Sequence, residues 1–434
     1  MLERLFQLKA HGTNVRKEVV AGFTTFLTMA YVIVVNPSIL SGTGMDFGAI
    51  FVATCLAATI GTLIMGLWAN YPIALAPGMG LNAFFSFTVV GSMGYSWQIA
   101  LGAVFISGFL FFILSLFRVR EWIINSIPLS LRFGISAGIG FFLALIAFKN
   151  AGVVIDNPAT LVGLGDIKSA ESLLFFGGFL LTCALAYRGV TGAVMIGIIA
   201  VTLVAMVLGL VQYKGFVSAP PSLAPTFMQL DLAGALNVTM ISVVFAFLFV
   251  DLFDTSGTLI GAAQRGGLLD KDGRLPRLGR ALMSDSVATM SGAALGTSTT
   301  TSYIESTAGI AAGGRTGLTA VVVALLFLAC LLLSPIASII PPYATAPALL
   351  YVAVLMTSGL KLIDWEDVTE AAPAVVTALM MPLTFSIANG IALGFITYAL
   401  LKMLSGRWNQ LSVSVAIIAL VFILKFTFLY VPGL

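Results

Sequence analysis

Long apolar runs recur along the whole chain, and their lengths predict helices that cross a membrane. A spanning helix needs about 20 predominantly apolar residues, and fewer where neighbouring protein shields it. The first set of seven runs lies at 18–40, 49–69, 72–90, 98–117, 129–149, 171–188 and 190–212. The second set of seven lies at 237–260, 281–296, 300–312, 317–340, 345–360, 371–386 and 388–404. A last run, 411–430, is either one more span or a terminal helix against the bundle.

The amino-acid composition also indicates a membrane protein. Of the 434 residues, 59% are hydrophobic and only 9% are charged. A soluble domain usually carries about 25% charged residues. We therefore expect an all-α integral membrane protein, surrounded by the lipid bilayer and without nucleic acid among its partners.

The positions of the basic residues predict which ends of the spans face the cytoplasm. With the polar leader 1–17 placed inside, seventeen Lys and Arg residues fall in inner loops, whereas only Lys149, Lys168 and Lys214 fall in outer loops. Loops rich in Lys and Arg stay on the cytoplasmic side of membranes. We expect a multi-pass protein of the plasma (inner) membrane with a cytoplasmic N-terminus.

Two predicted spans are interrupted at corresponding places in the two sets. Pro77, Gly78 and Gly80 should unwind the third span, and the hydroxyl-rich run 297–303 favours a short extended stretch before a half-helix in the tenth. Because each set holds an odd number of spans, the second set would be an inverted copy of the first. Paired breaks of this kind indicate a transporter's binding site near the middle of the membrane.

Two carboxylates lie in apolar surroundings, which makes them candidates for that site. Asp254 follows the apolar run 243–250, and Glu305 follows the hydroxyl-rich run. A charged side chain at the centre of a bilayer costs about 2.5–3.5 kcal/mol on insertion scales. The structural alternatives are a carboxylate that caps a kink and a partner in a buried salt bridge. Asp251, three residues before Asp254, is either a proton relay or a structural acceptor.

Other residues near the breaks would complete a polar pocket. Asn82 supplies an amide donor and acceptor, Gly80 allows close approach of a ligand, and Tyr303 lies two residues before Glu305. Asp285, near the start of the ninth span, reads as a cap or a loop anchor.

Nothing in the sequence indicates a catalytic or metal centre. Cys55, Cys183 and Cys330 lie inside apolar runs, and His11 lies in the polar leader. Metal-ligand spacings and a nucleophile with its base are both absent from the sequence. We expect no enzyme activity, no metal and no cofactor.

Four motifs, which occur in a fixed order along the chain, indicate a resemblance to a known family. They are GFTTFLTMAYVIVVNP (22–37), APGMGLNAFF (76–85), FDTSGTLIG (253–261) and TSYIES with GGRTGLTA (301–306 and 313–320). Together they resemble the azaguanine-type purine permeases, a branch of the second nucleobase–cation symporter family. The resemblance runs from about Leu2 to the end of the chain.

The resemblance implies a fold of fourteen spans in seven-plus-seven inverted repeats. Spans one to four and eight to eleven would form a core domain, and the others a gate domain. Spans three and ten would each carry a short strand and a half-helix. The divisions are 1–17 (leader), 18–117 and 237–340 (core), and 118–236 and 341–434 (gate). Homodimers are common in this family.

The resemblance also implies roles for individual residues. Asp254 and Glu305 match the acids that bind the base in spans eight and ten, and Gly80 and Asn82 match the substrate positions of span three. Many relatives carry a histidine or an acid where this chain has Thr258. The carrier of the coupled proton therefore stays open among Asp254, Glu305 and Asp251. The implied function is import of adenine, hypoxanthine or guanine by proton symport, with core and gate moving past each other.

An anion transporter for sulfate or bicarbonate on the same architecture is the alternative. Such a site would offer half-helix N-termini and no carboxylates, so Asp254 and Glu305 favour a base over an anion.

Competition experiments separate the two classes of cargo. We expect unlabelled adenine, in about tenfold excess over labelled purine, to suppress uptake strongly, because both compete for one site. The same excess of sulfate should leave uptake unchanged. Suppression by sulfate and not by adenine would favour the anion transporter.

Overall fold

The computed structural model describes residues 2–117, 127–213, 215–266, 268, 275–424 and 426–427, and most of them are helical. The first half contains α1 (Leu2–Phe6), α2 (Val15–Met29), α3 (Val32–Ser41), α4 (Phe47–Ile64), the π-helical turns η1 (Met65–Ala69) and η2 (Phe84–Ser92), β1 (Leu75–Pro77), α5 (Met79–Ala83), α6 (Trp97–Leu116), α8 (Leu129–Asn150), β2 (Val154–Asn157), β3 (Leu161–Leu164), α9 (Ala170–Tyr187), α10 (Ala193–Val207) and α11 (Leu232–Ala235). The second half contains α12 (Val238–Gly266), α13 (Leu278–Leu295), β4 (Thr300–Ser302), α14 (Ser306–Ala311), α15 (Gly317–Ala329), α16 (Ser334–Ile339), α17 (Pro342–Thr357), α18 (Val368–Leu383), α19 (Ile387–Leu404), α20 (Val413–Leu424) and the short 3-10 turns η3 (Cys330–Leu333), η4 (Ser358–Leu362) and η5 (Trp408–Gln410).

Many of these helices have the length and composition of membrane spans. Among the described residues, 8 stretches are long and apolar enough to cross a membrane, and shorter apolar helices include α10, α18 and α20. The expected first span, 18–40, consists of α2 and α3 with an interruption at Ala30 and Tyr31. The last apolar run, 411–430, extends beyond the described residues, and within it α20 (Val413–Leu424) packs against α19. The chain is thus a multi-pass membrane protein.

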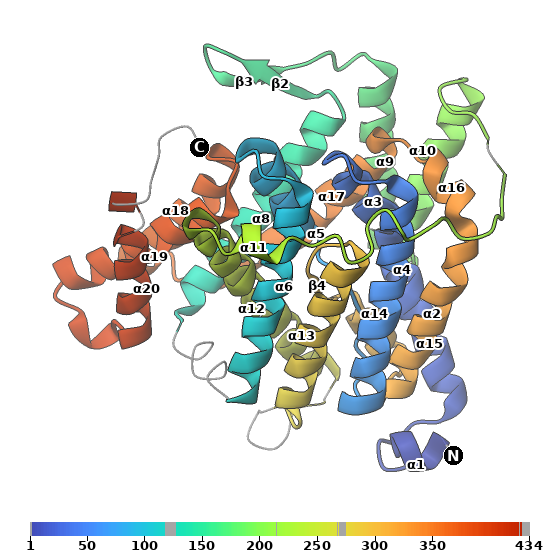
Figure 1. Ribbon diagram of the computed structural model, residues 1–434, viewed down its shortest axis with the longest axis horizontal. Helices are drawn as coiled ribbons and strands as arrows, with labels where there is room; N and C mark the ends of the chain where they lie inside the picture. Colours follow the sequence, from blue (N-terminus) through green and yellow to red (C-terminus); the bar gives the residue numbers. More distant parts are fainter. Residues whose placement is uncertain are drawn as a thin grey trace.

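The two predicted breaks meet in the middle of the molecule, where β1 pairs with β4 in antiparallel fashion (Figure 1). Ala76 lies opposite Thr301 in this pairing. The N–H of Gly78 extends the pairing by donating to the carbonyl of Thr299 at 2.9 Å, and the N–H of Tyr303 donates to the carbonyl of Ala74 at 2.9 Å. Each unwound segment therefore satisfies the backbone groups of the other, as irregular backbone inside a membrane requires. The extended stretch expected at 297–303 is confirmed as β4.

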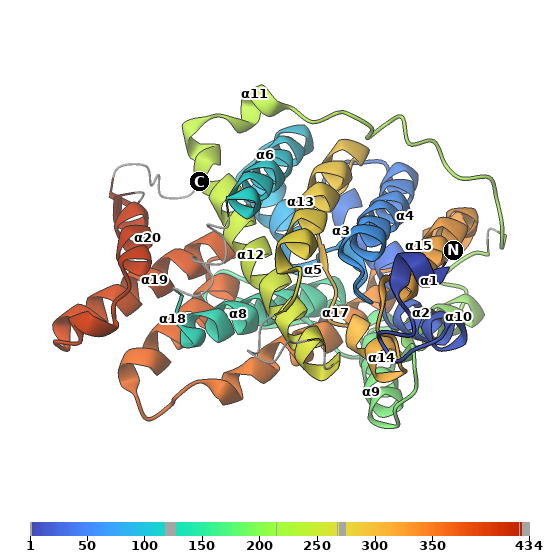
Figure 2. The same cartoon turned by 90° about the horizontal axis from the view of Figure 1, so that it is seen from below.

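The long helices pack into two sets of neighbours (Figure 2). In one set, α13 lies against α4 and α6, and α15 lies against α2 and α4. In the other, α8 lies against α17 and α18, α18 against α19, and α9 against α10 and α17. Helices that are far apart in the sequence therefore pack side by side.

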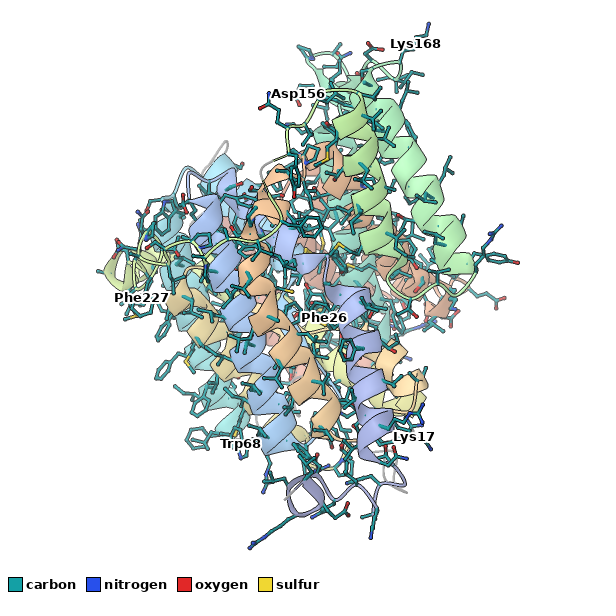
Figure 3. All side chains as sticks on the ribbon, turned by 90° about the vertical axis from the view of Figure 1, so that its right-hand side faces the viewer. Lys17, Phe26, Trp68, Asp156, Lys168 and Phe227 are labelled. Atoms are coloured by element: carbon teal, nitrogen blue, oxygen red, sulfur yellow. The ribbon has the colours of Figure 1, made fainter. Side chains whose placement is uncertain are left out.

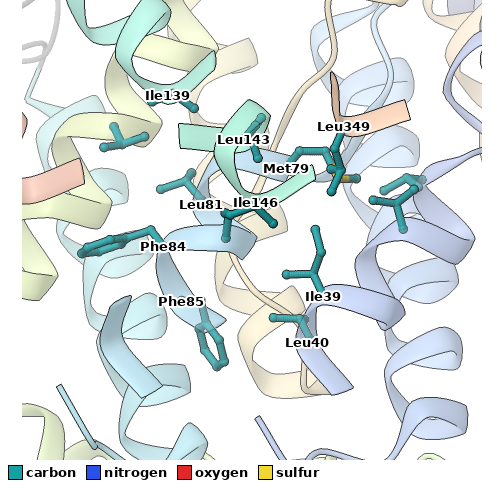
Figure 4. Close-up of a cluster of buried hydrophobic side chains, with 14 of the residues drawn as sticks. Ile39, Leu40, Met79, Leu81, Phe84, Phe85, Ile139, Leu143, Ile146 and Leu349 are labelled. Atoms are coloured by element: carbon teal, nitrogen blue, oxygen red, sulfur yellow. The ribbon is translucent and has the colours of Figure 1, made fainter. Parts of the chain in front are cut away.

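The short helix α5 sits in an apolar cluster where the two sets of helices meet (Figure 4). Met79 and Leu81 of α5 lie close to Ile139 and Leu143 of α8. The neighbouring Phe84 is also fully buried. Burial of these side chains holds α5 in place at the end of the broken segment.

An extended segment, 215–231, connects α10 to α11 and runs along one face of the molecule (Figure 2). Its backbone is attached at several points: the N–H of Met228 donates to the carbonyl of Ala294, and the N–H of Asp231 donates to the carbonyl of Gln98. These contacts attach the segment to the ends of α13 and α6.

An ionic cluster joins α18 and α19. The fully buried ammonium of Lys402 lies 2.8 Å from Oε1 of Glu370, and it donates to the hydroxyl of Thr369 at 2.8 Å. Asp367, in the loop before α18, pairs with Arg407. Hydrogen bonds from Thr369, together with the charge of Arg407, lower the pKa of Asp367 to about 2. Removal of Glu370 alone would leave the buried charge of Lys402 without its carboxylate partner, which is strongly destabilising.

The two ends of the molecule carry different segments (Figure 3). Lys17 and Trp68 lie at one end, and Asp156 and Lys168 lie at the opposite end.

The contact between α15 and η1, the turn that follows α4, depends on two glycines and generates a stability prediction. A Cβ at Gly317 would overlap the carbonyl group of Gly66. We expect Gly317→Ala to destabilise the protein by about 1–3 kcal/mol, since overpacking in a close contact costs that much. The measurement is the thermal unfolding of the purified protein in detergent.

The matched control is Gly177→Ala in α9, where a Cβ would meet nothing within 4 Å. That variant should be neutral or slightly stabilising, because alanine favours helix over glycine. Equal melting temperatures for the two variants would contradict the role of the close contact.

Candidate functional site

A cavity of about 70 Å³ lies beside the β1–β4 pairing. Its lining comes from both broken segments and from long helices of both sets: Tyr31, Gly78, Met79, Gly80, Leu81, Ile139, Val250, Asp254, Thr258, Thr301, Ser302, Tyr303, Ile304, Glu305, Val352 and Met356. Asp254, Glu305, Gly80 and Tyr303, four of the predicted site residues, therefore face one space.

Glu305 directly precedes α14, where the chain leaves the strand β4. Its Oε1 accepts a hydrogen bond of 2.7 Å from the hydroxyl of Tyr31, which lies in the interruption between α2 and α3. The hydroxyl of Thr28 donates to the backbone carbonyl of Glu305 at 3.4 Å. The bond from Tyr31 orients the carboxylate, which lines the cavity and can accept N–H donors of a ligand.

Asp254 reaches the same cavity from the middle of α12. The hydroxyl of Thr301, in β4, lies 3.4 Å from Oδ2 of Asp254. Gly78 lies nearby, since a Cβ at that position would be 3.8 Å from the same oxygen. The absence of a side chain at Gly78 keeps the approach to Asp254 open.

Tyr303 contributes its ring to the lining, but its hydroxyl already has a partner. The phenol donates to the carbonyl of Pro77 at 2.5 Å, across the strand pairing. Tyr303 thus holds the two breaks together as well as facing the cavity.

Asn82 lies outside the cavity lining, unlike the expectation from sequence. The residue is fully buried on α5. Gly80 lines the cavity, and residues two positions apart point to different sides of a helix, so Asn82 faces elsewhere.

Asp251 also lies outside the cavity lining. It belongs to a separate cluster of buried side chains that includes Thr255 and Asp285. Oδ1 of Asp251 is 3.3 Å from the hydroxyl of Thr255, which in turn is 2.9 Å and 3.0 Å from the two oxygens of Asp285. Asp251 and Asp285 are both fully buried. The hydroxyl of Thr255 therefore lies between a carboxylate of α12 and a carboxylate of α13.

Sequence reasoning missed the role of Asp285, which was expected to be a cap or a loop anchor. Its Oδ1 accepts the N–H of Ser302 at 3.1 Å, so the residue supports β4 from behind. The available signal was an acid in a run of small and apolar residues, but the sequence did not say which backbone group it would meet.

Metal binding finds no support in the part of the chain that the structure describes. No group of three or more His, Cys, Asp or Glu side chains in those ranges is arranged to hold an ion. The cavity instead offers two carboxylates, hydroxyl groups and an apolar wall, which suits a small polar molecule with N–H donors.

Comparisons with known proteins show that the chain is similar to permeases. The sequence model Xan_ur_permease, described as a permease family, matches residues 16–393. The chain is 52% identical over 429 residues to adenine permease AdeP of Escherichia coli, covering 99% of this chain and 96% of the relative. It is 45% identical over 440 residues to guanine/hypoxanthine permease PbuG of Bacillus subtilis, covering 99% and 100%.

A solved structure shares the fold at much lower sequence identity. The transmembrane domain of the cyanobacterial bicarbonate transporter BicA matches with a TM-score of 0.66 and 15% identity, covering 86% of this chain and 97% of that domain. This likeness concerns the architecture alone.

The close contact between Gly80 and α8 generates a prediction for the site. A Cβ at Gly80 would overlap Cγ2 of Ile139, whose β-branched side chain is stiff. We expect Gly80→Ala to cost about 1–3 kcal/mol of stability. In an Ile139→Ala background the same change should cost less, with a coupling of about 1 kcal/mol between the two positions.

Thermal unfolding of the four proteins in detergent gives this coupling. Additive effects of the two substitutions would show that Gly80 and Ile139 are not in contact in the folded protein.

Proposed function

Because the chain belongs to the permease family whose model matches residues 16–393, we propose that it carries purine bases across a membrane by secondary active transport. The cargo is adenine, hypoxanthine or guanine, the bases that appear in the names of its relatives. The observation that carries the proposal is one cavity lined by both Asp254 and Glu305, next to two breaks in the helices.

The chemistry of a purine fits this lining. A purine presents N–H donors beside ring acceptors on a flat, largely apolar body. Carboxylate oxygens accept such N–H groups strongly where water is excluded. The hydroxyls of Thr258 and Thr301 can donate to or accept from the ring, and Gly80 lets the base approach the backbone.

Proton symport supplies the driving force in this proposal. Two carboxylates share one small space, and a proton on one of them would remove the repulsion between like charges. The candidates for this proton are Asp254, Glu305 and Asp251. Asp254 and Glu305 have the stronger support, because they line the cavity.

Alternating access would come from movement between a core and a gate. The cavity lies between Asp254 and Glu305 on one side and Ile139 and Val352 on the other. Asp254 lies on α12, which packs against α6, and Glu305 precedes α14, which packs against α2, whereas Ile139 and Val352 lie on α8 and α17 of the second set. A movement of one set past the other, by rocking or as an elevator, would expose the cavity to each side of the membrane in turn.

Fourteen spans in two inverted repeats remain part of the proposal. It is supported by the antiparallel pairing of β1 with β4, which occupy corresponding positions in the two halves. For orientation, we propose a cytoplasmic N-terminus in the inner membrane, because the basic residues cluster on that side.

An anion such as bicarbonate is the second candidate cargo, because BicA shares the fold. The two carboxylates in the cavity make it the weaker candidate, since they would repel an anion.

Uptake of radiolabelled adenine, in a strain without purine carriers of its own, tests the proposal. We expect Glu305→Gln to lower uptake about tenfold or more, because a hydrogen bond to a charged group contributes about 1.5–3 kcal/mol. A proton uncoupler should abolish uptake by the unchanged protein.

The matched control is Glu366→Gln, in an exposed loop before α18, which should behave like the unchanged protein. Unchanged uptake by Glu305→Gln would contradict the role of Glu305 in binding the base. Uptake that persists in the presence of the uncoupler would contradict coupling to protons.

A further inference from the structure

A second cavity, of about 260 Å³, lies next to the first. Glu305 and Val352 line both cavities, so these two side chains form the wall between them. The larger cavity extends from this wall to the turn between α9 and α10, which includes Gly189 and Thr191.

The helix α17 explains how the wall arises. Val352 and Met356 face the first cavity, whereas Tyr351 and Leu355 face the second. Each pair is spaced by four residues, which places its members on one face of a helix. The two faces are adjacent, and Val352 lies at their boundary, where it faces both spaces. Val352 is partly exposed, in line with its position between two open spaces.

The second cavity has a lining that suits a flat heterocycle. Tyr351 offers an aromatic ring, Thr191 offers a hydroxyl group, and Glu305 presents its carboxylate from the wall. Val194 and Leu355 add apolar surface. A base that leaves the first cavity past Glu305 would meet similar chemistry on the other side.

The cavity also lies where a pathway between the two sets of helices is expected. Glu305 and Thr307 come from the segment around α14, while Tyr351 and Thr191 come from α17 and the α9–α10 turn. The turn is close to α2, since a Cβ at Gly192 would lie 3.1 Å from the carbonyl of Leu27. The second cavity thus reaches from the candidate site to the ends of α9 and α10.

We propose that the second cavity is the vestibule through which the purine passes between the site and one side of the membrane, and that Val352 controls this passage. The side chain at position 352 and Glu305 form the gate between the two spaces. The size of the side chain at position 352 determines which bases pass. This inference rests on the proposed function, because it assumes that the cargo is a purine.

The experiment compares binding with transport in purified protein reconstituted into liposomes. Radiolabelled adenine is the probe, and the variants are Val352→Trp and, as the matched control, Val354→Trp. Val354 has the same side chain on the same helix, is 50% exposed, and lines neither of the two cavities. We expect Val352→Trp to lower the rate of adenine transport about tenfold more than it lowers the adenine affinity, because gating steps limit turnover. Val354→Trp should match the unchanged protein in both measurements.

A smaller side chain tests the same gate in the opposite direction. Val352→Ala should raise the transport of a bulky adenine, N6-benzyladenine, about tenfold relative to adenine, because a pocket discriminates by size to this extent. This variant removes atoms without adding any, so it tests the gate even if the tryptophan variant fails to fold.

Two results would overturn the inference. Val352→Trp could transport adenine at the unchanged rate, or it could lose binding and transport in equal proportion, in which case Val352 would belong to the binding site alone. An unchanged ratio of N6-benzyladenine transport to adenine transport in Val352→Ala would also overturn the inference. If the unchanged protein neither binds nor transports adenine, the proposed function fails together with the inference.

Discussion

The structure depends on one constraint, which is that backbone groups inside a membrane must find partners within the protein. A continuous helix meets this requirement alone, but a broken helix does not. Here the two breaks satisfy each other through the pairing of β1 with β4, extended by the bonds of Gly78 and Tyr303. Neither break would be stable without the other, so segments separated by more than two hundred residues are held together at the centre.

The candidate site follows from that pairing. The strands are short, so the chain re-enters helices at once, and the side chains beside the strands face a small space instead of a packed helix. Glu305 stands at the end of β4, while Asp254 reaches across from α12. Asp285 supports the strand from the opposite side by accepting the N–H of Ser302. The candidate site and the contact with Asp285 therefore both lie at the same short strand.

Glycine and small residues let the helices approach this centre closely. Gly317 meets Gly66 where α15 contacts η1, and Gly80 meets Ile139 where α5 approaches α8. The second contact joins α5 to α8, and both of its residues line the candidate cavity. Membrane helices pack in this way because lipid gives little hydrophobic drive for their association.

The sequence by itself determined the membrane class, most apolar segments, the two breaks and the acids Asp254 and Glu305, because composition and local pattern carry that information. The tertiary structure decided which residues share the cavity. It left Asn82 and Asp251 outside the lining and connected Asp285 to β4. It also brought Tyr31 and Val352 to the site, which the sequence had not connected with Asp254 and Glu305. Those outcomes depend on which face each helix turns toward its neighbours, and that is fixed by packing between segments far apart in the chain.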